Sequence, residues 1–456
     1  MDIQLSCHLK KKSNSDKINK LIELIKQKNF VLLFLILIII SCSPVKNIIV
    51  NRGVEVQLSE CKNISSSLYG LYVYDPDNKR EIVNINAEKL FTPASNTKIL
   101  TFLTCINTLK DSIAVLKYYQ RNDSLIFFGL AYPGFLNPNF NSDTIIAGFL
   151  KNRKEKLFYS DSNYSEGKFG TGWAWDDYLE YYQCEKSSLP IYGNSLNIEF
   201  ENDTFNVYPD YLRKNVNFVN DSFFIFRSAE TNQFQVGNFE NKSFKEIPLR
   251  MDTKSVIEAL QYESGKEINE WTGNLDNFQG PFLLNQKFSD SLYIRLMHNS
   301  DNFVAEQLML LCSSTIADTL STNVMINYSI KNYMPYLASN SRWVDGSGLS
   351  RYNLFKPSSI VKVLNDIYAK IGFVGIQKYF PEIMIYSSEE LNSDENAGKV
   401  FAKTGTLSNN FNLSGYILTK KSKIYLFSFM NNHFLSKPSV IRSEVKTILK
   451  YIIENY

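Results

Sequence analysis

Apolar positions along this chain either form short runs bounded by turns or recur at helical spacing, and each pattern predicts a different element. Residues 68–83 contain two strand-like runs, GLYVYD and the start of REIVNI, around a Pro76-Asp77-Asn78 turn, which is typical of a β-hairpin. After Ser95 the apolar side chains recur at helical spacing, so a helix is expected to begin at this serine. Helical spacing returns over residues 302–312.

The C-terminal part of the chain predicts three consecutive antiparallel strands followed by a helix. The strands are expected at residues 399–407, 411–419 and 423–430. Residues 440–456 place their apolar side chains on one face of a closing amphipathic helix. Between residues 112 and 275 the pattern is one of short strands and turns, so an inserted β-rich domain is expected there.

The N-terminal segment is interpreted as a targeting signal. A basic, polar stretch precedes the apolar run Phe30–Ile40, which is shorter than the about 20 residues of a membrane-spanning helix. Ser41 and Cys42 follow at once, as at the cleavage site of a bacterial lipoprotein, where the cysteine is lipidated. We therefore predict a signal peptide over residues 1–42 and a polar linker over residues 43–67.

Lipidation of Cys42 would give an exported protein of the periplasm or cell envelope, held on a membrane by its lipid. A plain cleaved signal and a short membrane anchor are the alternatives. The sequence does not determine which membrane leaflet would carry the anchor.

Length and charge limit the classes of function. A chain of 456 residues is long enough for two or three domains. The 49 basic and 46 acidic side chains leave a net charge of only +3. A nucleic-acid-binding protein would show a basic excess, so no nucleic-acid partner is expected. The oligomeric state is left undetermined.

The six cysteines and three histidines favour neither a disulfide framework nor metal chemistry. No C-x-x-C pair occurs, and Cys105 and Cys312 lie in apolar helical stretches typical of buried thiols. A multi-histidine metal site or a histidine-based triad is hard to build from so few histidines. Neither a metal nor a cofactor is therefore expected.

Ser95 and Lys98 form the first candidate catalytic pair. A serine hydroxyl is a poor nucleophile until a base takes its proton, and a neutral lysine amine can be that base. Residues three apart on a helix share a face, which places Lys98 within hydrogen-bond reach of Ser95. The same spacing recurs elsewhere in the chain, where a capping or surface serine explains it, so this motif alone is weak.

Ser300-Asp301-Asn302, which occurs once, is the second candidate motif. The Ser300 hydroxyl can relay a proton to a leaving amine, and the Asn302 amide can hold a substrate carbonyl and bond to Lys98. A helix N-cap would explain the same residues without catalysis. The Y-G-N stretch at residues 192–194 is a competing motif, but it leads into a strand rather than a helix.

The K-T-G motif at residues 403–405 also occurs once, on a predicted strand. Lys403 can point into a cleft, while Gly405 has no Cβ and lets a substrate approach the backbone. The N–H groups of Thr406 and Ser95 can then complete an oxyanion hole. The charge of Lys403 also favours a neutral amine at Lys98. An ordinary edge-strand lysine before a turn would explain this motif in isolation.

Together, in this order, the three motifs are the signature of penicillin-binding proteins and class A β-lactamases. The chain resembles the class C low-molecular-mass penicillin-binding proteins, the D-alanyl-D-alanine carboxypeptidase/endopeptidase family. The long interval between Ser95 and Ser300 favours this family, because class A β-lactamases have a much shorter one. The stretches that carry the resemblance are Phe91–Leu100 (FTPASNTKIL), Gly172–Asp177 (GWAWDD), His298–Glu306 (HNSDNFVAE), Val344–Leu354 (VDGSGLSRYNL) and Gly398–Leu407 (GKVFAKTGTL).

The resemblance implies an α/β (α+β) fold. Its serine β-lactamase/transpeptidase-like domain would have an antiparallel sheet flanked by helices and a helical subdomain. That domain would comprise residues 68–111 and 276–456, interrupted by the inserted domain at 112–275. It also implies a serine-type D-alanyl-D-alanine carboxypeptidase that acts on peptidoglycan stem peptides and binds β-lactam antibiotics. Some relatives also cut peptide crosslinks.

In such an enzyme Ser95 would attack the D-Ala-D-Ala carbonyl and form an acyl-enzyme, which water then hydrolyses. Lys403 with Thr404 or Thr406 would hold the substrate carboxylate. The base in each half-reaction is left open between Lys98 and another group. A β-lactamase, and a non-catalytic lipoprotein scaffold or sensor that binds cell-wall peptides, are the alternative functions.

Two stretches depart from the family pattern. Relatives have a G-D-P-like segment where this chain has Leu130–Phe135 (LAYPGF), with Tyr132 in place of the acid. We expect altered recognition of the peptide's third residue, although Tyr132 packing the insert against the main domain is an equal alternative. The glycine-containing loop usual before the K-T-G strand is not recognisable in residues 385–397. The family stretch 345–351 is assigned no catalytic role.

Overall fold

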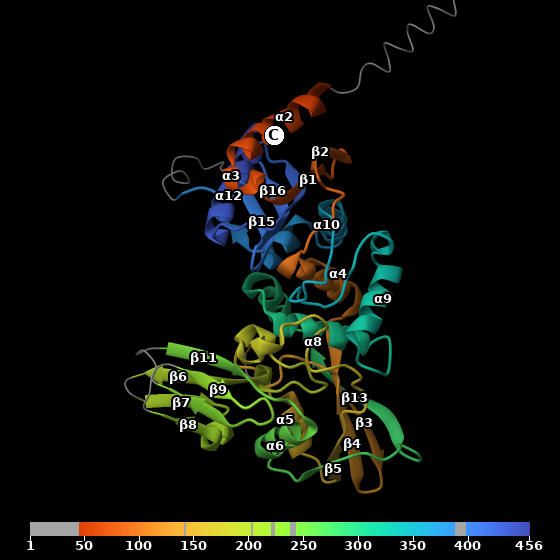
Figure 1. The fold of residues 1–456 in the computed structure, drawn as a ribbon. Coiled ribbons are helices and arrows are strands. Elements are labelled where there is room, and N and C mark those ends of the chain that lie inside the picture. Colours follow the sequence, from red (N-terminus) through yellow and green to blue (C-terminus); the bar gives the residue numbers. More distant parts are fainter. Residues whose placement is uncertain (1–44, 141–142, 202–203, 220–223, 238–242, 388–397) are drawn as a thin grey trace, which may run out of the picture. The chain divides into compact units, whose positions relative to one another are not determined.

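A computed structural model of the chain describes residues 45–140, 143–201, 204–219, 224–237, 243–387 and 398–456 (Figure 1). The chain divides into two compact units, Met1–Glu55 and Val56–Tyr456, and the site described below lies in the second. The predicted signal peptide, with Cys42, lies outside the described residues. Within the described ranges, no helix is both long and apolar enough to span a bilayer.

Residues 43–67, expected to be a polar linker, contain the helices α2 (Val45–Glu60) and α3 (Lys62–Ser65). Ile64 of α3 is buried. The Glu444 carboxylate on helix α12 (Pro438–Asn455) accepts hydrogen bonds from the backbone N–H groups of Asn63 and Ile64, at 3.2 and 2.9 Å. Helix α3 is therefore fixed by a carboxylate far away in the sequence, which local composition does not reveal.

A six-stranded antiparallel sheet forms one layer, in the order β14-β15-β16-β17-β1-β2. The predicted hairpin and the three predicted C-terminal strands are confirmed. Because β1 pairs with β17, segments from both ends of the second unit complete one sheet. The strands are β1 (Leu68–Asp75), β2 (Arg80–Ile85), β14 (Glu382–Ile383), β15 (Lys399–Leu407), β16 (Asn410–Leu418) and β17 (Ile424–Asn432).

Helices cover both faces of this sheet. Helix α12 packs on β16, and α10 (Pro357–Tyr379) packs on β1, β16 and β17. In β16, the Phe411 ring contacts Arg442 of α12, whereas the Tyr416 hydroxyl donates to the Leu364 carbonyl of α10 at 2.7 Å. Phe411 and Tyr416 are an odd number of positions apart in the strand, so they point to opposite faces. The two helices therefore lie on opposite faces, and the expected sheet flanked by helices is confirmed.

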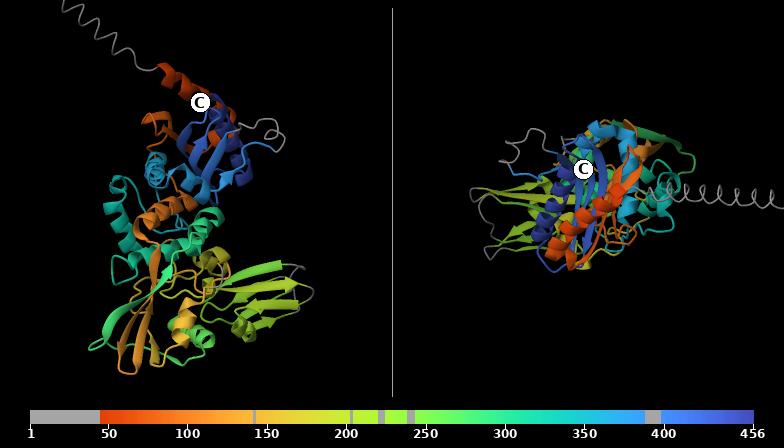
Figure 2. Two further views of the ribbon diagram at one scale, coloured as in Figure 1. Left: turned by 180° about the vertical axis from the view of Figure 1, so that it is seen from behind. Right: turned by 90° about the horizontal axis from the view of Figure 1, so that it is seen from above.

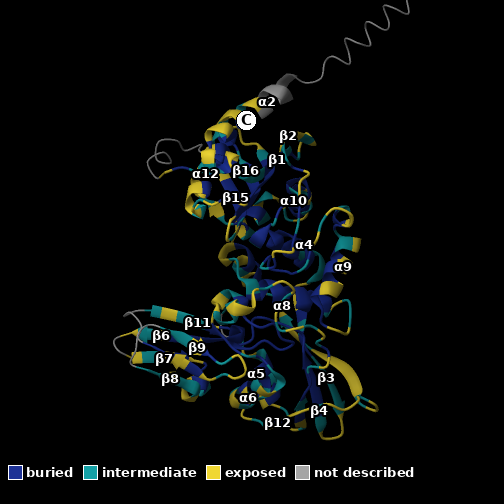
Figure 3. Ribbon diagram, viewed as in Figure 1, coloured by how far each residue is buried: buried dark blue, intermediate teal, exposed yellow. Residues whose placement is uncertain are grey.

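A helical layer lies beside the sheet. Its helices are α4 (Lys98–Thr108), α8 (Asn302–Ser313) and α9 (Thr322–Asn332). The short helix α7 (Ser291–Ile294) precedes α8 in the chain. Helix α8 packs against both α4 and α9. Every residue of α8 from Phe303 to Ser313 is buried, and Figure 3 shows α4 and α8 largely in the buried interior. A helix without a solvent face is held by its neighbours alone, so α8 is a fixed support for whatever its N-terminus carries.

The region expected to be an inserted β-rich domain contains three sheets, seen from two further sides in Figure 2. Their strand orders are β12-β5-β4-β3-β13, β11-β6-β7 and β8-β10-β9. Strand β13 pairs with β3, so the first sheet continues past the boundary predicted at residue 275. The division into a catalytic and an inserted domain stays a prediction.

The elements of this region include two helices that the pattern of short strands did not indicate, α5 (Ile145–Lys151) and α6 (Thr253–Ser264). The strands are β3 (Ser112–Arg121), β4 (Ser124–Gly129), β5 (Lys156–Tyr159), β6 (Ser195–Glu201), β7 (Thr204–Tyr208), β8 (Val216–Phe218), β9 (Ile225–Arg227), β10 (Phe234–Val236), β11 (Ser243–Pro248), β12 (Ile268–Glu270) and β13 (Gln279–Lys287).

Candidate active site

Ser95 lies in one turn of 3₁₀-helix, Ala94–Thr97, that leads directly into α4. Lys98, the first residue of α4, is fully buried, and its Nζ lies 3.1 Å from the Ser95 Oγ. Ser95 also lines a cavity of about 830 Å³. The residue that carries the hydroxyl thus borders an open space, while the hydroxyl itself contacts a buried amine, as the S-x-x-K spacing predicts.

Close backbone packing holds the turn that presents Ser95. Ala94 has φ +48°, a conformation that residues with a side chain rarely adopt. A Cβ on Gly348 would lie 1.9 Å from the Ala94 carbonyl oxygen, and a Cβ on Gly405 would lie 2.6 Å from that of Pro93. Gly405 is therefore required for β15 to approach the Ser95 turn, a reason that differs from the substrate access expected from sequence.

Asn96, a spacer position in the S-x-x-K motif, ties the Ser95 turn to the sheet. Its side chain is buried, and its Nδ2 donates to the Lys403 carbonyl of β15 at 2.9 Å. Its Oδ1 accepts from the Ser414 hydroxyl of β16 at 2.6 Å. The nucleophile turn and the K-T-G strand are therefore fixed relative to one another.

Ser300 and Asn302 converge on the two lysines. Ser300 has φ +59° at the end of a π-helical turn, and Asp301 caps α8 by accepting from a first-turn backbone N–H at 3.0 Å. The capping role that competes with catalysis thus belongs to Asp301. The Lys98 Nζ donates to Asn302 Oδ1 at 2.6 Å, and the Lys403 Nζ donates to Ser300 Oγ at 2.8 Å.

The K-T-G strand forms one wall of the site. Lys403 is buried, and its Nζ donates to the Thr404 carbonyl at 3.0 Å as well as to Ser300. Thr406 is exposed and lines the same cavity as Ser95. An oxyanion hole built from the N–H groups of Ser95 and Thr406 stays a prediction. The position of both residues at one cavity allows it.

The stretch 345–351, to which the sequence assigned no catalytic role, supplies a third partner of Lys98. The Lys98 Nζ donates to the Ser347 carbonyl at 2.7 Å. The Ser347 N–H in turn donates to the Glu306 carboxylate at 2.7 Å, and Glu306 lies fully buried on α8. Sequence reasoning missed this contact because any residue has a carbonyl, so no residue type signals it.

The buried Asp345 side chain holds this stretch in a tight loop by accepting hydrogen bonds from it. Its carboxylate accepts from the backbone N–H groups of Gly348 and Ser350 at 2.8 and 2.6 Å, and from the Asn353 side chain at 2.7 Å. The Trp173 indole N–H, from the G-W-A-W-D-D stretch, adds a contact of 3.0 Å. Two stretches that resemble the family outside the three motifs therefore position the carbonyl that faces Lys98.

Burial sets the protonation of both lysines. Removal from water lowers the pKa of Lys98 to about 8. The nearby carboxylates that oppose this shift are Asp345, Glu306 and Asp301. Burial and the neighbouring charge of Lys98 lower the pKa of Lys403 well below its ordinary value. A neutral amine is therefore accessible at Lys98 near neutral pH, as a general base requires.

The competing motif Tyr192–Asn194 has partners of its own in the inserted region. The Tyr192 hydroxyl donates to the Glu263 carboxylate at 2.5 Å. The Asn194 amide donates to the Glu185 carbonyl at 2.7 Å. Both side chains are buried in these contacts, and the partners of Lys98 come from other segments, so this stretch does not replace Ser300 and Asn302.

Tyr132 is buried and donates its hydroxyl to Asp143 at 2.6 Å. The Gln286 side-chain amide donates to the same carboxylate oxygen at 2.7 Å. All three line a second cavity, of about 570 Å³, which shares Asn139 with the cavity at Ser95. Tyr132 takes the place of an acid in the LAYPGF segment, and the carboxylate of Asp143 lies beside it. Altered recognition of the peptide's third residue stays a prediction.

These contacts suit acyl transfer. The Ser95 hydroxyl, a candidate nucleophile, contacts a buried amine that is able to be neutral, and a second hydroxyl, that of Ser300, contacts a second lysine. Reactions of this kind need a nucleophile, a base, a proton relay and a site for the developing oxyanion within one cleft. The segments around Ser95, Ser300, Lys403 and Ser347 bring these groups together.

Comparisons with known proteins agree with this chemistry. The model of the D-Ala-D-Ala carboxypeptidase 3 (S13) family matches residues 258–451. Penicillin-sensitive carboxypeptidase A of Dictyostelium discoideum is 23% identical over 447 residues, which cover 81% of this chain and 84% of that protein. D-alanyl-D-alanine carboxypeptidase DacB of Haemophilus influenzae is 26% identical over 147 residues, covering 30% of this chain and 31% of that protein.

The fold also has a solved counterpart. The crystal structure of penicillin-binding protein 4 (dacB) from Haemophilus influenzae matches with a TM-score of 0.67 at 18% identity. The match covers 88% of this chain and 99% of that one. The expected fold class is thereby confirmed.

The charge of Glu306 should set the pH at which Lys98 becomes a base. The acylation rate of Ser95 by penicillin should rise with pH as Lys98 loses its proton, with a midpoint near the Lys98 pKa of about 8. Glu306→Gln keeps an acceptor for the Ser347 N–H but removes a charge that favours protonated Lys98. The midpoint should therefore move below that of the wild type.

Stopped-flow acylation over a pH series measures this midpoint. Glu258→Gln, on the exposed side of α6, is the matched control and should leave the midpoint unchanged. A midpoint that is the same in Glu306→Gln and the wild type would show that Lys98 does not sense this carboxylate.

Proposed function

We propose that the chain is a member of the D-Ala-D-Ala carboxypeptidase 3 (S13) family and that Ser95 is its acylated nucleophile. The protein is a serine-type D-alanyl-D-alanine carboxypeptidase, a penicillin-binding hydrolase that acts on peptidoglycan. The observation that carries the residue assignment is the 3.1 Å contact between Lys98 Nζ and Ser95 Oγ at a cavity.

In the first half-reaction the Ser95 oxygen attacks the carbonyl carbon of the D-Ala-D-Ala bond. Neutral Lys98 takes the hydroxyl proton along the 3.1 Å contact. The negative charge that develops on the carbonyl oxygen is stabilised by the N–H groups of Ser95 and Thr406. Expulsion of D-alanine needs a proton on its amine, and the Ser300 hydroxyl relays it. Water then attacks the ester and restores Ser95.

Lys403 supports both steps. Its Nζ contacts the Ser300 hydroxyl at 2.8 Å, which orients that hydroxyl for the relay. With Thr404 or Thr406 it also holds the carboxylate at the end of the substrate peptide. Asn302 anchors Lys98 through its Oδ1 at 2.6 Å, so a neutral lysine stays directed at Ser95.

Two alternatives fit these contacts less well. A non-catalytic cell-wall-binding scaffold has no need of a buried amine against a serine hydroxyl. A β-lactamase must hydrolyse its acyl-enzyme quickly, and the carboxypeptidase family supplies no reason to expect that. Cleavage of peptide crosslinks by this chain is a further activity of the same site that digestion of purified peptidoglycan would test.

Penicillin should acylate Ser95, because the β-lactam amide imitates the D-Ala-D-Ala bond. Peptide mass spectrometry should find the adduct on the fragment that contains Ser95, and Ser95→Ala should abolish labelling. Ser443→Ala is the matched control, since Ser443 has the same S-x-x-K spacing but is exposed on α12 and should be dispensable. Labelling that survives Ser95→Ala would exclude this serine as the nucleophile.

Lys403→Ala should cut activity on pentapeptides that end in a free carboxylate by at least about tenfold, since a charge-assisted contact contributes roughly 1.5–3 kcal/mol. Lys399→Ala, an exposed change on the same strand, should have little effect. Steady-state kinetics on a free and an amidated peptide separates carboxylate binding from the relay. Equal wild-type rates on the two peptides would contradict the carboxylate role.

We further propose that the protein is exported and carries lipid on Cys42, since Ser41-Cys42 follows an apolar signal-like run. Cys42→Ser should shift the protein from the membrane to the soluble fraction or leave it unprocessed, because each buried CH₂ of an acyl chain contributes about 0.8 kcal/mol. Cys7→Ser, within the signal, is the control and should not change fractionation. A mature N-terminus elsewhere, without labelling by palmitate analogues, would refute the anchor.

A further inference from the structure

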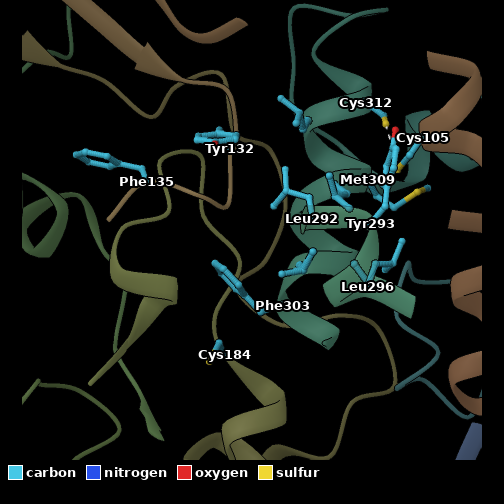
Figure 4. Packing of buried hydrophobic residues seen from close by; sticks show 14 of the residues in the cluster. Cys105, Tyr132, Phe135, Cys184, Leu292, Tyr293, Leu296, Phe303, Met309 and Cys312 are labelled. Atoms are coloured by element: carbon cyan, nitrogen blue, oxygen red, sulfur yellow. Dashed lines mark hydrogen bonds between the residues drawn. The ribbon is translucent and has the colours of Figure 1, made fainter. Parts of the chain in front are cut away.

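Two cysteines that are distant in sequence face one another behind the active site. Cys105 lies on α4 and Cys312 on α8, and their sulfur atoms are 3.7 Å apart. Figure 4 shows the two side chains directed toward each other beside Tyr293. Both side chains are fully buried. The sequence alone predicts two separate buried thiols, because nothing local relates residues on two different helices.

The other two buried cysteines of the described part of the chain have different partners. The Cys61 sulfur lies 3.9 Å from the Glu444 carbonyl, and the Cys184 sulfur lies 3.5 Å from the Tyr181 carbonyl. A thiol in such a position is satisfied by the backbone. Among the cysteines that the structure describes, Cys312 differs because its thiol donates to another sulfur, that of Cys105.

The helices that carry the pair are those that carry the first two catalytic motifs. Helix α4 begins at Lys98 and α8 begins at Asn302, and these two residues are joined by the 2.6 Å contact at the active site. Cys105 is two turns along α4 from that contact. A link between the sulfurs would therefore hold the same two helices together at a second point.

We propose that Cys105 and Cys312 form a disulfide in the exported protein. Each thiol loses a proton and together they lose two electrons, and an S–S bond forms between them. The electron acceptor is the disulfide of a thiol–disulfide oxidant, which is reduced to two thiols. This chemistry suits the oxidising compartments that exported proteins enter, and it rests on the export proposed above but not on the peptidase activity.

The geometry requires a small adjustment. The sulfurs must approach from 3.7 Å to the about 2.05 Å of an S–S bond, which side-chain rotation and a slight shift of two packed helices can supply. Burial raises the pKa of Cys312 well above its ordinary value, so attack by its thiolate is disfavoured in the finished fold. Oxidation therefore occurs while α8 is still packing onto α4. The bond closes a loop whose ends are 207 positions apart, which strongly restricts the unfolded chain.

Peptide mapping of the full chain, recovered from the envelope of cells that export it, tests the bond directly. The protein is denatured in N-ethylmaleimide without reductant and then digested with trypsin. The expected product is fragment 99–110 joined to fragment 296–331, each holding one cysteine of the pair. Reduction before alkylation should separate the two fragments. Recovery of both fragments with alkylated thiols, without prior reduction, would overturn the proposal.

Thermal unfolding gives a second readout. Dithiothreitol should lower the melting temperature of the wild type by roughly 3 °C or more, as loss of a crosslink does. Cys105→Ala and Cys312→Ala should each be less stable than the wild type, and neither should respond to dithiothreitol. Cys184→Ala, at another buried thiol, is the matched control and should keep the full response. A wild type that does not respond would argue against the bond, whatever the enzyme's activity on peptides.

Discussion

The proposed active site depends on how one buried amine is held. The Lys98 Nζ contacts the Ser95 hydroxyl, the Asn302 side chain and the Ser347 carbonyl, at 3.1, 2.6 and 2.7 Å. These acceptors come from three segments that are far apart in the chain. An ammonium in a water-free position is unstable without such partners, so its burial requires the three segments to meet. The catalytic geometry and the packing of the domain are therefore consequences of the same contacts.

The groups that contact the Lys98 amine directly are neutral. The carboxylates do not touch the amine and act through the groups that do. Glu306 reaches Lys98 through the Ser347 peptide, and Asp345 acts by folding the loop that contains this peptide. A carboxylate in direct contact would stabilise the ammonium strongly and keep the amine protonated. With the carboxylates displaced, burial dominates and the pKa of Lys98 falls to about 8. The loop thus allows one lysine to be both firmly positioned and chemically basic.

Closely packed surroundings hold the groups that contact Lys98 in place. The Ser95 turn is fixed to the sheet by Asn96 and is approached so closely by Gly348 and Gly405 that no side chain fits at either position. Helix α8, which carries Asn302, is buried on all sides. Trp173, which follows β5 in sequence, reaches the Asp345 loop, so the region expected to be an insertion also supports the site. These constraints leave the cavity in front of Ser95 open while fixing its walls.

The sequence by itself determined the chemistry and much of the main sheet. Short runs bounded by turns predicted the first hairpin and β15 to β17, and helical periods predicted α8 and α12, because each of these elements buries one face or lies wholly in the core. Three motifs of fixed spacing predicted Ser95, Lys98, Ser300, Asn302 and Lys403 as site residues, because their reactivity resides in the side chains themselves.

Only the tertiary structure decided the rest. It showed that residues 45–60 and 62–65 are helical, and the Glu444 carboxylate that holds α3 comes from the opposite end of the chain. It brought Glu306 behind Ser347 and Cys312 against Cys105. Contacts of this kind join backbone groups or side chains on separate elements, so they have no period and no local spacing. They exist only once the chain has packed, which is why no reading of neighbouring residues reveals them.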